Sequence, residues 1–351
     1  MTPAVHIVNL SGGKDSQACA LLAAERGRPF RLVMADTGNE HQATIDHAHL
    51  VAEHVGQPLE IVRADFTDRI AAKREAVRQK WTEEGVNENY IRDALDVLQP
   101  TGIPFLDLCL WKGRFPSRMA QFCTEHLKSE AIQVHVTDKI LSRTSVVHWL
   151  GVRRDESPSR RAAPMFQLVR QDRTKGDALL FRPIIHWTAE NVVGFSQAHG
   201  LPLNPLYSEG MSRVGCFPCI NAGKDELAEI HTRFPEATER VREWERLVAM
   251  ASKRSSASFF EPGKTPEGAD MQRELKRLVA HRLSLMPPFE KEADRRRAEK
   301  LLISQIAPNF DWPKIDSIMD WATTTGRGGR NRLLPLDEPE LGCSSHYGLC
   351  E

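Results

Sequence analysis

The short segment from Ser11 to Ser16, Ser-Gly-Gly-Lys-Asp-Ser, combines residue types that suit the binding of a phosphate group. An apolar run from Val5 to Leu10 precedes it and predicts a short buried strand, and an alanine-rich stretch from Ser16 predicts a helix. A glycine turn between a strand and a helix directs backbone N–H groups and the positive end of the helix dipole at one point. Lys14 adds a positive charge there and the two serines add hydroxyl donors, so the segment predicts an anion-binding cradle rather than an ordinary turn.

The order of these residues excludes one common phosphate loop and resembles another. The Walker loop requires Gly-x-x-x-x-Gly-Lys followed by Ser or Thr, whereas Asp15 follows Lys14 here. The segment instead resembles the PP-loop of the N-type ATP pyrophosphatases and of their relatives, the phosphoadenosine phosphosulfate (PAPS) reductases. That resemblance implies that ATP, with Mg²⁺, is bound and cleaved between its α and β phosphates, with Lys14 and Asp15 as catalytic residues. It also implies that the β,γ-diphosphate is held by Ser11, Gly12, Gly13, Lys14, Asp15 and Ser16.

A second candidate for nucleotide contact is the segment Asp-Thr-Gly-Asn-Glu, which follows a predicted strand at residues 30–35. Ligands of parallel α/β sheets bind beyond the carboxyl ends of the strands, where this segment and the cradle are both expected. The segment resembles the turn that lies beside the nucleotide in the same family, and its carboxylates could reach a ribose hydroxyl or a metal ion. We therefore expect Asp36, Gly38 and Glu40 to contact the nucleotide. For Asp36 the alternative is a helix N-cap.

Arginines are concentrated after a further predicted strand at residues 146–150, in the run Gly-Val-Arg-Arg-Asp-Glu-Ser-Pro-Ser-Arg-Arg. Guanidinium groups bind oxyanions through two parallel hydrogen bonds, so the run predicts a phosphate or sulfate site at the rim of the crevice. It also resembles the Gly-x-Arg-x-x-Glu-Ser-x-x-Arg element of the PAPS reductases. A solvated charged surface is the alternative. The residues expected to bind are Arg153, Arg154, Glu156, Arg160 and Arg161.

The spacing Cys216-x-x-Cys219 is typical of a metal-binding hairpin, although a closed zinc or iron–sulfur site needs four ligands. Buried, redox-inert cysteines are the alternative. The successive motifs Pro-Ile-x-x-Trp-Thr, Asn-Pro-Leu-Tyr and Arg-x-Gly-Cys-x-x-Cys also resemble PAPS-reductase-like proteins, so the likeness extends over residues 5–222. By this resemblance Cys123 is the third ligand and a [4Fe–4S] cluster is favoured over zinc. Thr124 stands where the family has a second cysteine, which removes one expected ligand.

The C-terminal tail carries two further cysteines within its last nine residues. We expect Cys343 to be the fourth ligand of the metal site, with Cys350 and Cys109 as alternatives. PAPS reductases carry a mobile C-terminal cysteine that attacks the sulfate sulfur, and the ending Tyr-Gly-Leu-Cys-Glu has a similar composition in a different order. Cys350 is therefore a candidate catalytic nucleophile.

Strand and helix patterns alternate through the first half of the chain, which is typical of a parallel sheet covered on both faces. The resemblance implies an adenine nucleotide alpha hydrolase-like fold, an α/β protein with a doubly wound, mostly parallel sheet and a C-terminal helical extension. Thr124 and Thr188 precede helical patterns and are expected to be N-caps. We expect a nucleotide-binding domain with the cysteine motif at residues 1–224, a helical accessory region at 225–325, and a basic loop with the cysteine-containing tail at 326–351.

The composition limits the class of protein. The 351 residues suffice for about two domains, and the 47 basic and 47 acidic residues cancel, so a nucleic-acid partner must be met by a local patch. No apolar run approaches the roughly 20 residues of a membrane span, and the first residues show no signal-peptide pattern. We expect a cytoplasmic protein without a membrane partner, whose cysteines serve metal binding or catalysis rather than disulfides.

The predicted function is that of an ATP pyrophosphatase, which cleaves ATP to AMP and pyrophosphate and adenylates its substrate for sulfur transfer. The DNA phosphorothioation enzymes and some tRNA thiolases are similar. The expected partners are an adenine nucleotide, a nucleic acid or small-molecule acceptor, and a sulfur-donor protein such as a cysteine desulfurase or thioredoxin; an oligomer is left open. One alternative is a thiol-dependent PAPS or adenosine phosphosulfate (APS) reductase, which the tail cysteine keeps open. The other is a non-catalytic nucleotide-sensing or DNA-binding subunit, against which Lys14 and Asp15 argue.

Overall fold

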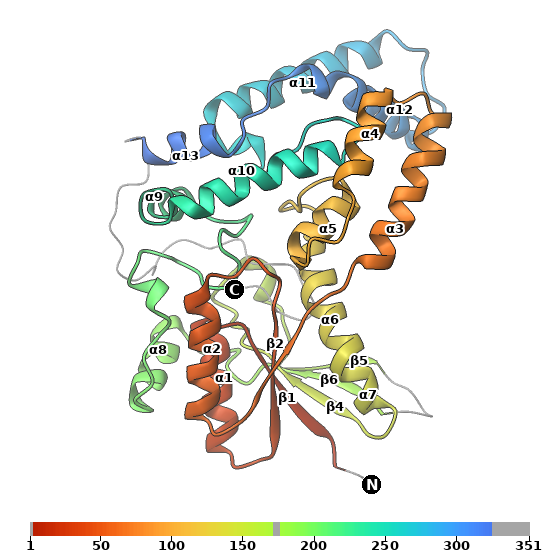
Figure 1. Cartoon of the computed structure of the whole chain (residues 1–351). Coiled ribbons are helices and arrows are strands. Elements are labelled where there is room, and N and C mark those ends of the chain that lie inside the picture. Colours follow the sequence, from red (N-terminus) through yellow and green to blue (C-terminus); the bar gives the residue numbers. More distant parts are fainter. Residues whose placement is uncertain (1–2, 171–175, 325–351) are drawn as a thin grey trace.

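The computed structural model describes residues 3–170 and 176–324 of the chain (Figure 1). A sheet flanked by helices forms one half of the molecule, and helices alone form the other half (Figure 1). The predicted tail segment 326–351, with Cys343 and Cys350, lies outside the described residues.

The sheet has six strands in the order β3-β2-β1-β4-β6-β5. All neighbouring strands are parallel except β5, which pairs antiparallel with β6 at one edge. This arrangement confirms the predicted mostly parallel α/β fold. The strands span β1 Val5–Leu10, β2 Phe30–Ala35, β3 Leu59–Val62, β4 Val146–Trp149, β5 Phe166–Arg170 and β6 Ala178–Phe181.

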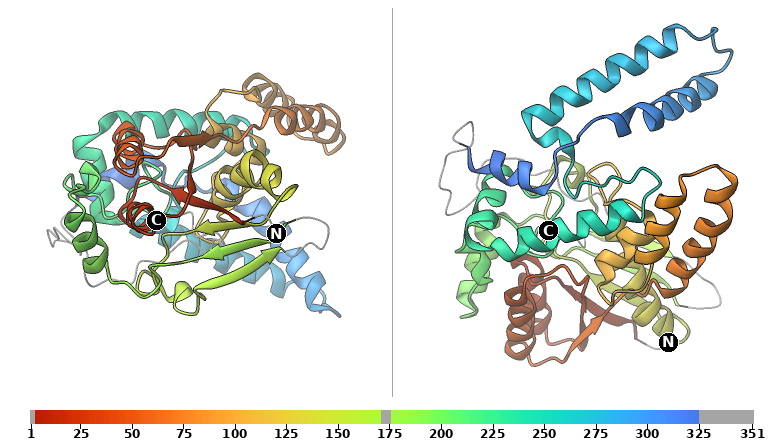
Figure 2. Two further views of the ribbon diagram at one scale, coloured as in Figure 1. Left: turned by 90° about the horizontal axis from the view of Figure 1, so that it is seen from below. Right: turned by 45° about the horizontal axis from the view of Figure 1, so that its top comes forward.

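Helices cover both faces of this sheet because its central strands are apolar on both sides. Val8 and Leu32 point to one face and Ile7 and Val33 to the other, since successive side chains alternate along a strand. The first face packs against α1 Lys14–Glu25, α2 Gln42–His54 and α8 Ala189–Ala198. The second face packs against a continuous helical segment made of η2 Thr124–Ser129, α6 Glu130–Ile132, η3 Gln133–Thr137 and α7 Asp138–Leu141 (Figures 1 and 2).

The remaining helices pack together beyond the carboxyl end of the sheet (Figure 1). They come from two parts of the chain: α3 Thr67–Ala76, η1 Val77–Trp81, α4 Glu88–Val97 and α5 Pro104–Lys112 precede β4, whereas α9 Lys224–Arg233, α10 Pro235–Met250, α11 Pro266–Ser284, α12 Glu292–Ile306 and α13 Ile315–Thr323 follow the sheet. One apolar cluster joins both parts, and the rings of Phe105 and Trp244 stack in it with centroids 5.4 Å apart. The expected boundary after residue 224 falls at the start of α9, but the division into domains stays a prediction.

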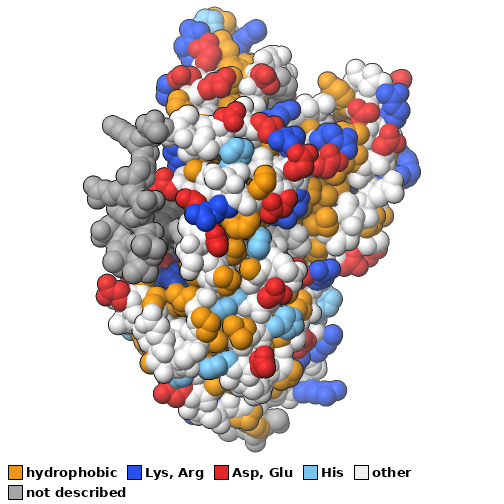
Figure 3. Space-filling view, turned by 60° about the vertical axis from the view of Figure 1, so that its left-hand side comes forward, with side chains coloured by type: hydrophobic (Ala, Val, Ile, Leu, Met, Phe, Trp, Pro, Cys, Tyr) orange, Lys and Arg blue, Asp and Glu red, His pale blue; other side chains and the backbone are white. Residues whose placement is uncertain are grey.

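Helices α11 and α12 form a hairpin that extends away from the rest of the molecule (Figure 2). In the view of Figure 3, acidic and basic side chains are interspersed mainly over the upper, helical part of the molecule, whereas the part below shows fewer charged side chains and several histidines. Within residues 3–170 and 176–324, no helix combines the length and the apolar character that crossing a bilayer requires.

Several local expectations differ from the structure. Helix α1 begins at Lys14 rather than Ser16, because Gly13 is its N-cap and the cradle runs directly into the first helical turn. The prediction that Thr124 caps a helix is wrong: the helical segment begins at Phe122, and Thr124 is buried inside it. Thr188 is confirmed as an N-cap, since its side chain accepts a hydrogen bond from the backbone of Asn191 in a capping box.

Candidate functional site

The predicted cradle is a hydrogen-bonded loop between β1 and α1. Ser16 Oγ accepts a hydrogen bond from Ser11 N at 3.1 Å, lies 3.0 Å from Ser11 Oγ and donates to Gly13 O at 2.9 Å. Gly12 has a φ of +81°, and a Cβ there would lie 2.5 Å from Cγ2 of Thr44. The path of the loop therefore depends on a glycine at position 12.

Helix α1 presents its N-terminus to the loop, because its N-cap Gly13 has no side chain to bind the first N–H groups. Lys14 N donates to Tyr207 Oη at 3.1 Å, and the Lys14 ammonium lies 5.2 Å from the centroid of the same ring. The ammonium is also 3.9 Å from Oδ2 of Asp15. The cradle thus combines a lysine charge with a helix N-terminus, which suits a polyphosphate.

A distant segment around η5 Pro205–Tyr207 holds the cradle from the side. Asn204 Nδ2 donates to Gly12 O at 3.1 Å, and Gln17 in α1 donates to Pro202 O at 3.2 Å. The sequence motif Asn-Pro-Leu-Tyr is part of the family resemblance, but the resemblance assigns it no role in the site. Asn204 and Tyr207 are therefore residues of the site that sequence reasoning missed.

The arginine run reaches the cradle through Arg153. Its Nε donates to Asp15 Oδ1 at 2.6 Å, and the two side chains are 5% and 0% exposed. The close approach requires Gly151, where a Cβ would lie 2.6 Å from the carbonyl carbon of Asp15 and 2.7 Å from Ser16 N. Asp15 Oδ2 is buried and has no hydrogen-bond partner among the described residues. The Lys14 ammonium is the charged neighbour of this oxygen, at 3.9 Å, so Oδ2 takes part in an ion pair but in no hydrogen bond within the described chain.

The other predicted arginines also have partners within the chain. Arg154 donates to Ala163 O at 3.0 and 3.2 Å, and Arg160 forms an ion pair with Glu156. Burial raises the pKa of Glu156, while the charge of Arg160 opposes that rise. Arg161 is exposed. The binding of a substrate phosphate or sulfate by this run stays a prediction.

The loop from Asp36 to Glu40 follows β2, the neighbour of β1, and so lies at the same edge of the sheet as the cradle. Asp36 accepts hydrogen bonds from Gly38 N at 2.8 Å and from Nε of Arg63 at 2.8 Å. The alternative role of Asp36 as a helix N-cap is wrong, because His41 caps α2 with its side chain. Nucleotide contact by Asp36, Gly38 and Glu40 remains a prediction.

Glu40 connects this loop to the cysteine motif. Glu40 and Cys216 form an isolated antiparallel β-bridge. Beside the bridge, Phe217 N donates a hydrogen bond to Asn39 O at 2.5 Å. The Glu40 carboxylate accepts hydrogen bonds from Thr37 N and Oγ1 at 2.9 and 2.7 Å and lies 4.0 Å from the Cys216 sulfur. Burial raises the pKa of Glu40, although the charge of Lys128 opposes the rise.

Three of the predicted metal ligands, Cys123, Cys216 and Cys219, line one small cavity, which Lys128 also lines. Among the described residues no three His, Cys, Asp or Glu side chains are placed as a ready metal site. The three thiols still fit the donor chemistry of a thiolate-bound metal, with a fourth ligand to be supplied from elsewhere. Cys109, an alternative ligand, is fully buried in α5, and burial raises the pKa of its thiol.

A mostly parallel α/β sheet with a glycine- and lysine-containing loop at its carboxyl edge is an arrangement typical of α/β proteins that bind ligands beyond the strand ends. The comparison with known families is more specific. Residues 5–222 match the phosphoadenosine phosphosulfate reductase domain. The chain belongs to this family, and its C-terminal helices lie beyond the matched residues.

The chain is also similar to individual proteins. An uncharacterized 37.8 kDa protein of Escherichia phage 186 is 40% identical, over 99% of this chain and 97% of that protein. An adenosine 5′-phosphosulfate reductase of Halalkalibacterium halodurans is 30% identical over 41% of this chain and 60% of the relative. The crystal structure of a PAPS reductase from Candida auris aligns with a TM-score of 0.37 and 16% identity, covering 62% of this chain and 84% of that chain.

Proposed function

We propose that the protein is an adenylating ATP pyrophosphatase that prepares an acceptor for sulfur transfer. An acceptor oxygen attacks the α-phosphorus of ATP, the bond to the β-phosphate oxygen breaks, and pyrophosphate leaves. A sulfur nucleophile then attacks the adenylated atom and displaces AMP. The observation that supports this function is the backbone bridge between Glu40 and Cys216, because it joins the cysteine motif to a loop at the carboxyl edge of the sheet, where the cradle also lies.

In this proposal the cradle binds the β- and γ-phosphates that become pyrophosphate. Lys14 and the first turn of α1 stabilise the negative charge that develops on the leaving group. Arg153 fixes the orientation of Asp15, and Oδ2 of Asp15, which has no hydrogen bond within the described chain, is the protein oxygen proposed to bind Mg²⁺. Mg²⁺, when bound, would neutralise part of the phosphate charge.

The cysteine cavity would hold a [4Fe–4S] cluster or, alternatively, zinc. Its protein ligands would be Cys123, Cys216 and Cys219, with Cys343 as the proposed fourth. Such a group would supply or hold the sulfur that enters the product. A cysteine desulfurase or thioredoxin is the proposed source of sulfur or electrons.

The second candidate is a sulfonucleotide reductase. The specific observation in its favour is that the named relatives in the match include adenosine 5′-phosphosulfate reductases. In that reaction Cys350 would attack the sulfate sulfur and no ATP would be consumed. The complete cradle with its lysine favours the first candidate, because a substrate with one 5′-phosphosulfate has less need for a diphosphate site.

One experiment separates these candidates. The purified protein is incubated anaerobically with ATP and Mg²⁺, and AMP and pyrophosphate are quantified; a parallel sample receives PAPS or APS with thioredoxin. Equal amounts of AMP and pyrophosphate support the pyrophosphatase, and sulfite release without ATP cleavage supports the reductase. Neither product, with tight ATP binding, indicates a nucleotide-sensing subunit and contradicts the proposal.

A further inference from the structure

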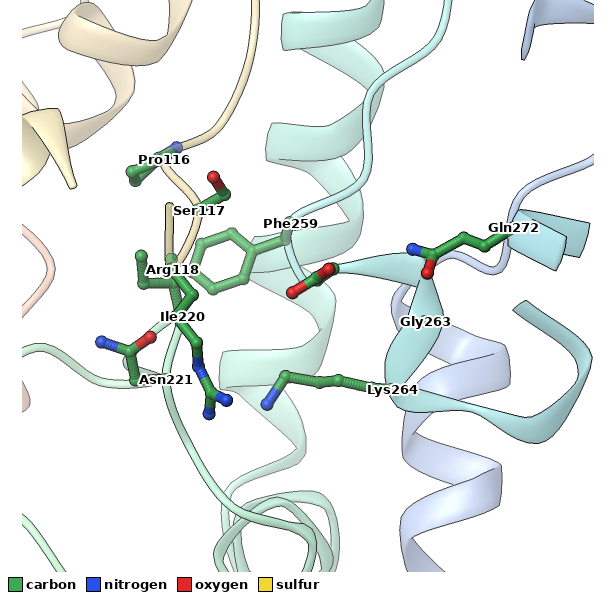
Figure 4. Close-up of a pocket in the computed structure, with 10 residues that line it drawn as sticks. Pro116, Ser117, Arg118, Ile220, Asn221, Phe259, Gly263, Lys264 and Gln272 are labelled. Atoms are coloured by element: carbon green, nitrogen blue, oxygen red, sulfur yellow. The ribbon is translucent and has the colours of Figure 1, made fainter. Parts of the chain in front are cut away.

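A pocket of about 230 Å³ lies between the family domain and the C-terminal helices (Figure 4). One wall comes from the segment Pro116 to Arg118 and from Ile220 and Asn221, which belong to the family domain. The other wall lies beyond the family match and comes from Phe259, Glu261, Gly263, Lys264 and Gln272. We call this the Arg118 pocket.

Two cations point into the Arg118 pocket. The guanidinium of Arg118 and the ammonium of Lys264 are directed toward the same space (Figure 4). Arg118 forms no hydrogen bond or ion pair with any described residue; Lys264 donates to Ala222 O at 2.6 Å. Burial lowers the pKa of Lys264, and the positive charge of Arg118 lowers it further, so the two cations affect each other. Glu261 is the one acidic residue in the lining, which leaves an excess of positive charge.

A tight turn fixes the backbone at Arg118, whose side chain is exposed. Ser117 and Ala120 pair across a tight turn, with N–H···O distances of 3.2 and 3.0 Å in the two directions. Arg118 lies within this turn. At the opposite wall, a Cβ on Gly263 would lie 2.6 Å from Oε1 of Gln272, so the glycine admits the amide side chain. Amide and hydroxyl groups of Gln272, Asn221 and Ser117 add hydrogen-bonding capacity beside the cations.

The Arg118 pocket adjoins the cysteine cavity. Ile220 and Asn221 line both, and they follow Cys219 directly in the chain. A group bound by Arg118 and Lys264 would therefore lie next to the place where sulfur chemistry is proposed. The volume is below the roughly 300–1,000 Å³ of pockets that enclose drug-sized ligands. The pocket thus fits a small charged group, such as one phosphate with part of its sugar, rather than a whole nucleotide.

We propose that the Arg118 pocket binds a phosphate ester group of the sulfur acceptor, at a site separate from the phosphate cradle around Lys14. Two cations and neutral amide donors are the groups that recognise a phosphate oxyanion. Binding of the phosphate rests on the pocket alone, whereas its role as part of the acceptor rests on the proposed function.

The test is calorimetric titration of the full chain in a Lys14→Ala background, which weakens the cradle. The ligands are inorganic phosphate, thymidine 5′-monophosphate, a short 5′-phosphorylated oligodeoxynucleotide and unphosphorylated thymidine. We expect the phosphate-bearing ligands to bind and thymidine not to bind. Adding Arg118→Gln is expected to weaken phosphate binding about tenfold or more, since a charge-assisted hydrogen bond is lost. Arg118→Lys should have an intermediate effect.

The matched control is Arg143→Gln, which removes an exposed arginine from the turn before β4 and should leave binding unchanged. Arg118 is chosen for substitution rather than Lys264 because the Lys264 ammonium also donates a hydrogen bond to Ala222 O. Equal affinities with and without Arg118, or no phosphate binding in the Lys14→Ala background, overturn the proposal. Stronger binding of the oligonucleotide than of inorganic phosphate identifies a nucleic acid as the source of the phosphate; equal binding identifies a free small anion.

The proposed function fails by a different measurement. If the wild-type protein forms no AMP but loses phosphate binding with Arg118→Gln, the pocket stands and the adenylation function does not. If AMP forms and phosphate binding is unaffected by Arg118→Gln, the adenylation function stands and the proposal for the pocket does not.

Discussion

Asp15 and Arg153 lie 138 positions apart in the sequence and form an ion pair that is almost completely buried. In the C-terminal helices, by contrast, Arg242 pairs with Asp316 while both side chains remain about half exposed, at 45% and 55%. Most other ion pairs of these helices join residues three or four positions apart on one helix, such as Arg246 and Glu243. Such exposed pairs contribute little to stability.

The family domain and the C-terminal helices thus differ in where their charged side chains lie. The family domain also has exposed ion pairs, such as Arg31 with Glu60, but at the carboxyl edge of its sheet Asp15 and Arg153 are buried and matched over a long sequence distance. In the C-terminal helices most ion pairs lie on the exposed surface, and the apolar side of the helices packs into the core, as with Trp244 against Phe105. Glu245 is an exception, because it is buried and accepts hydrogen bonds from Phe259 N and Ile315 N. Lys264 also differs from these exposed charges, because its ammonium points into a pocket that residues of the family domain also line.

The largest expected effect is the loss of ATP cleavage in Lys14→Ala. Lys14 places its charge beside the N-terminus of α1, and each charge-assisted hydrogen bond to phosphate contributes about 1.5–3 kcal/mol. Pyrophosphate release should fall at least tenfold to a hundredfold, while the circular dichroism spectrum stays unchanged. Lys139→Ala, on an exposed position of α7, is the control and should retain full activity. Equal turnover by both variants would contradict the role of the cradle.

The next effect concerns the cysteine cavity. Cys216→Ala should abolish bound iron in anaerobically purified protein, measured by metal analysis and visible absorption, because a thiolate ligand is removed. Cys109→Ala is the matched control, since that cysteine is buried in α5 outside the cavity. Stoichiometric zinc without iron would show that the cysteines bind zinc rather than an iron–sulfur cluster. Loss of metal in the Cys109 variant would instead make Cys109 the fourth ligand.

The comparison of the two ion pairs can be tested by stability. Arg153→Met leaves Asp15 buried without its partner, which costs about 3–5 kcal/mol. Arg242→Met removes an exposed pair and should cost within about 1 kcal/mol. Thermal unfolding of both variants beside the wild type gives the difference. Similar losses of stability in the two variants would show that the buried ion pair stabilises the fold no more than the exposed pair does.

A further effect is a loss of stability in mild acid. Burial lowers the pKa of His47 and of His148 from 6.5 to about 4. The unfolded chain therefore binds these protons first, so stability is full above about pH 6.5 and falls as the pH drops toward 4. The loss approaches about 3 kcal/mol per histidine, at 1.36 kcal/mol per pKa unit.

This prediction is checked by the unfolding temperature at several pH values for the wild type and His47→Gln. The variant should lose less stability between pH 7 and pH 4.5. His186→Gln, an exposed histidine, serves as the control and should follow the wild-type curve. The comparison between variants is needed because burial raises the pKa of Glu40 and Glu156, which acts in the opposite direction. Parallel curves for all three proteins would contradict the assignment.

The structural features that can be predicted from the sequence are those that depend on residues close together in the chain. The strand, glycine turn and helix around Lys14 follow from local patterns, as do the helix after Thr188 and the parallel order of the central strands. Strand β5 escapes prediction because it is a short edge strand with exposed side chains, including Phe166 at 59% exposure. No local pattern distinguishes such a strand from a loop.

Contacts between distant segments are beyond the reach of sequence patterns. The arginine run predicts an oxyanion site, but nothing in it indicates that Arg153 pairs with Asp15. Likewise, the resemblance identifies the Asn-Pro-Leu-Tyr motif without showing that Asn204 and Tyr207 support the cradle. Thr124 has the type expected of a cap, but the helix extends past it because Phe122 and Leu127 pack into the core.

The bridge between Glu40 and Cys216 is made by the main chain rather than by side chains. Every residue except proline supplies the same backbone N–H and C=O groups, so a main-chain bridge does not require particular side chains. The spacing between the loop after β2 and the cysteine hairpin can therefore stay the same when the side chains at 40 and 216 are exchanged. The main chain sets the distance between these two segments, and substitution changes only the groups that they present.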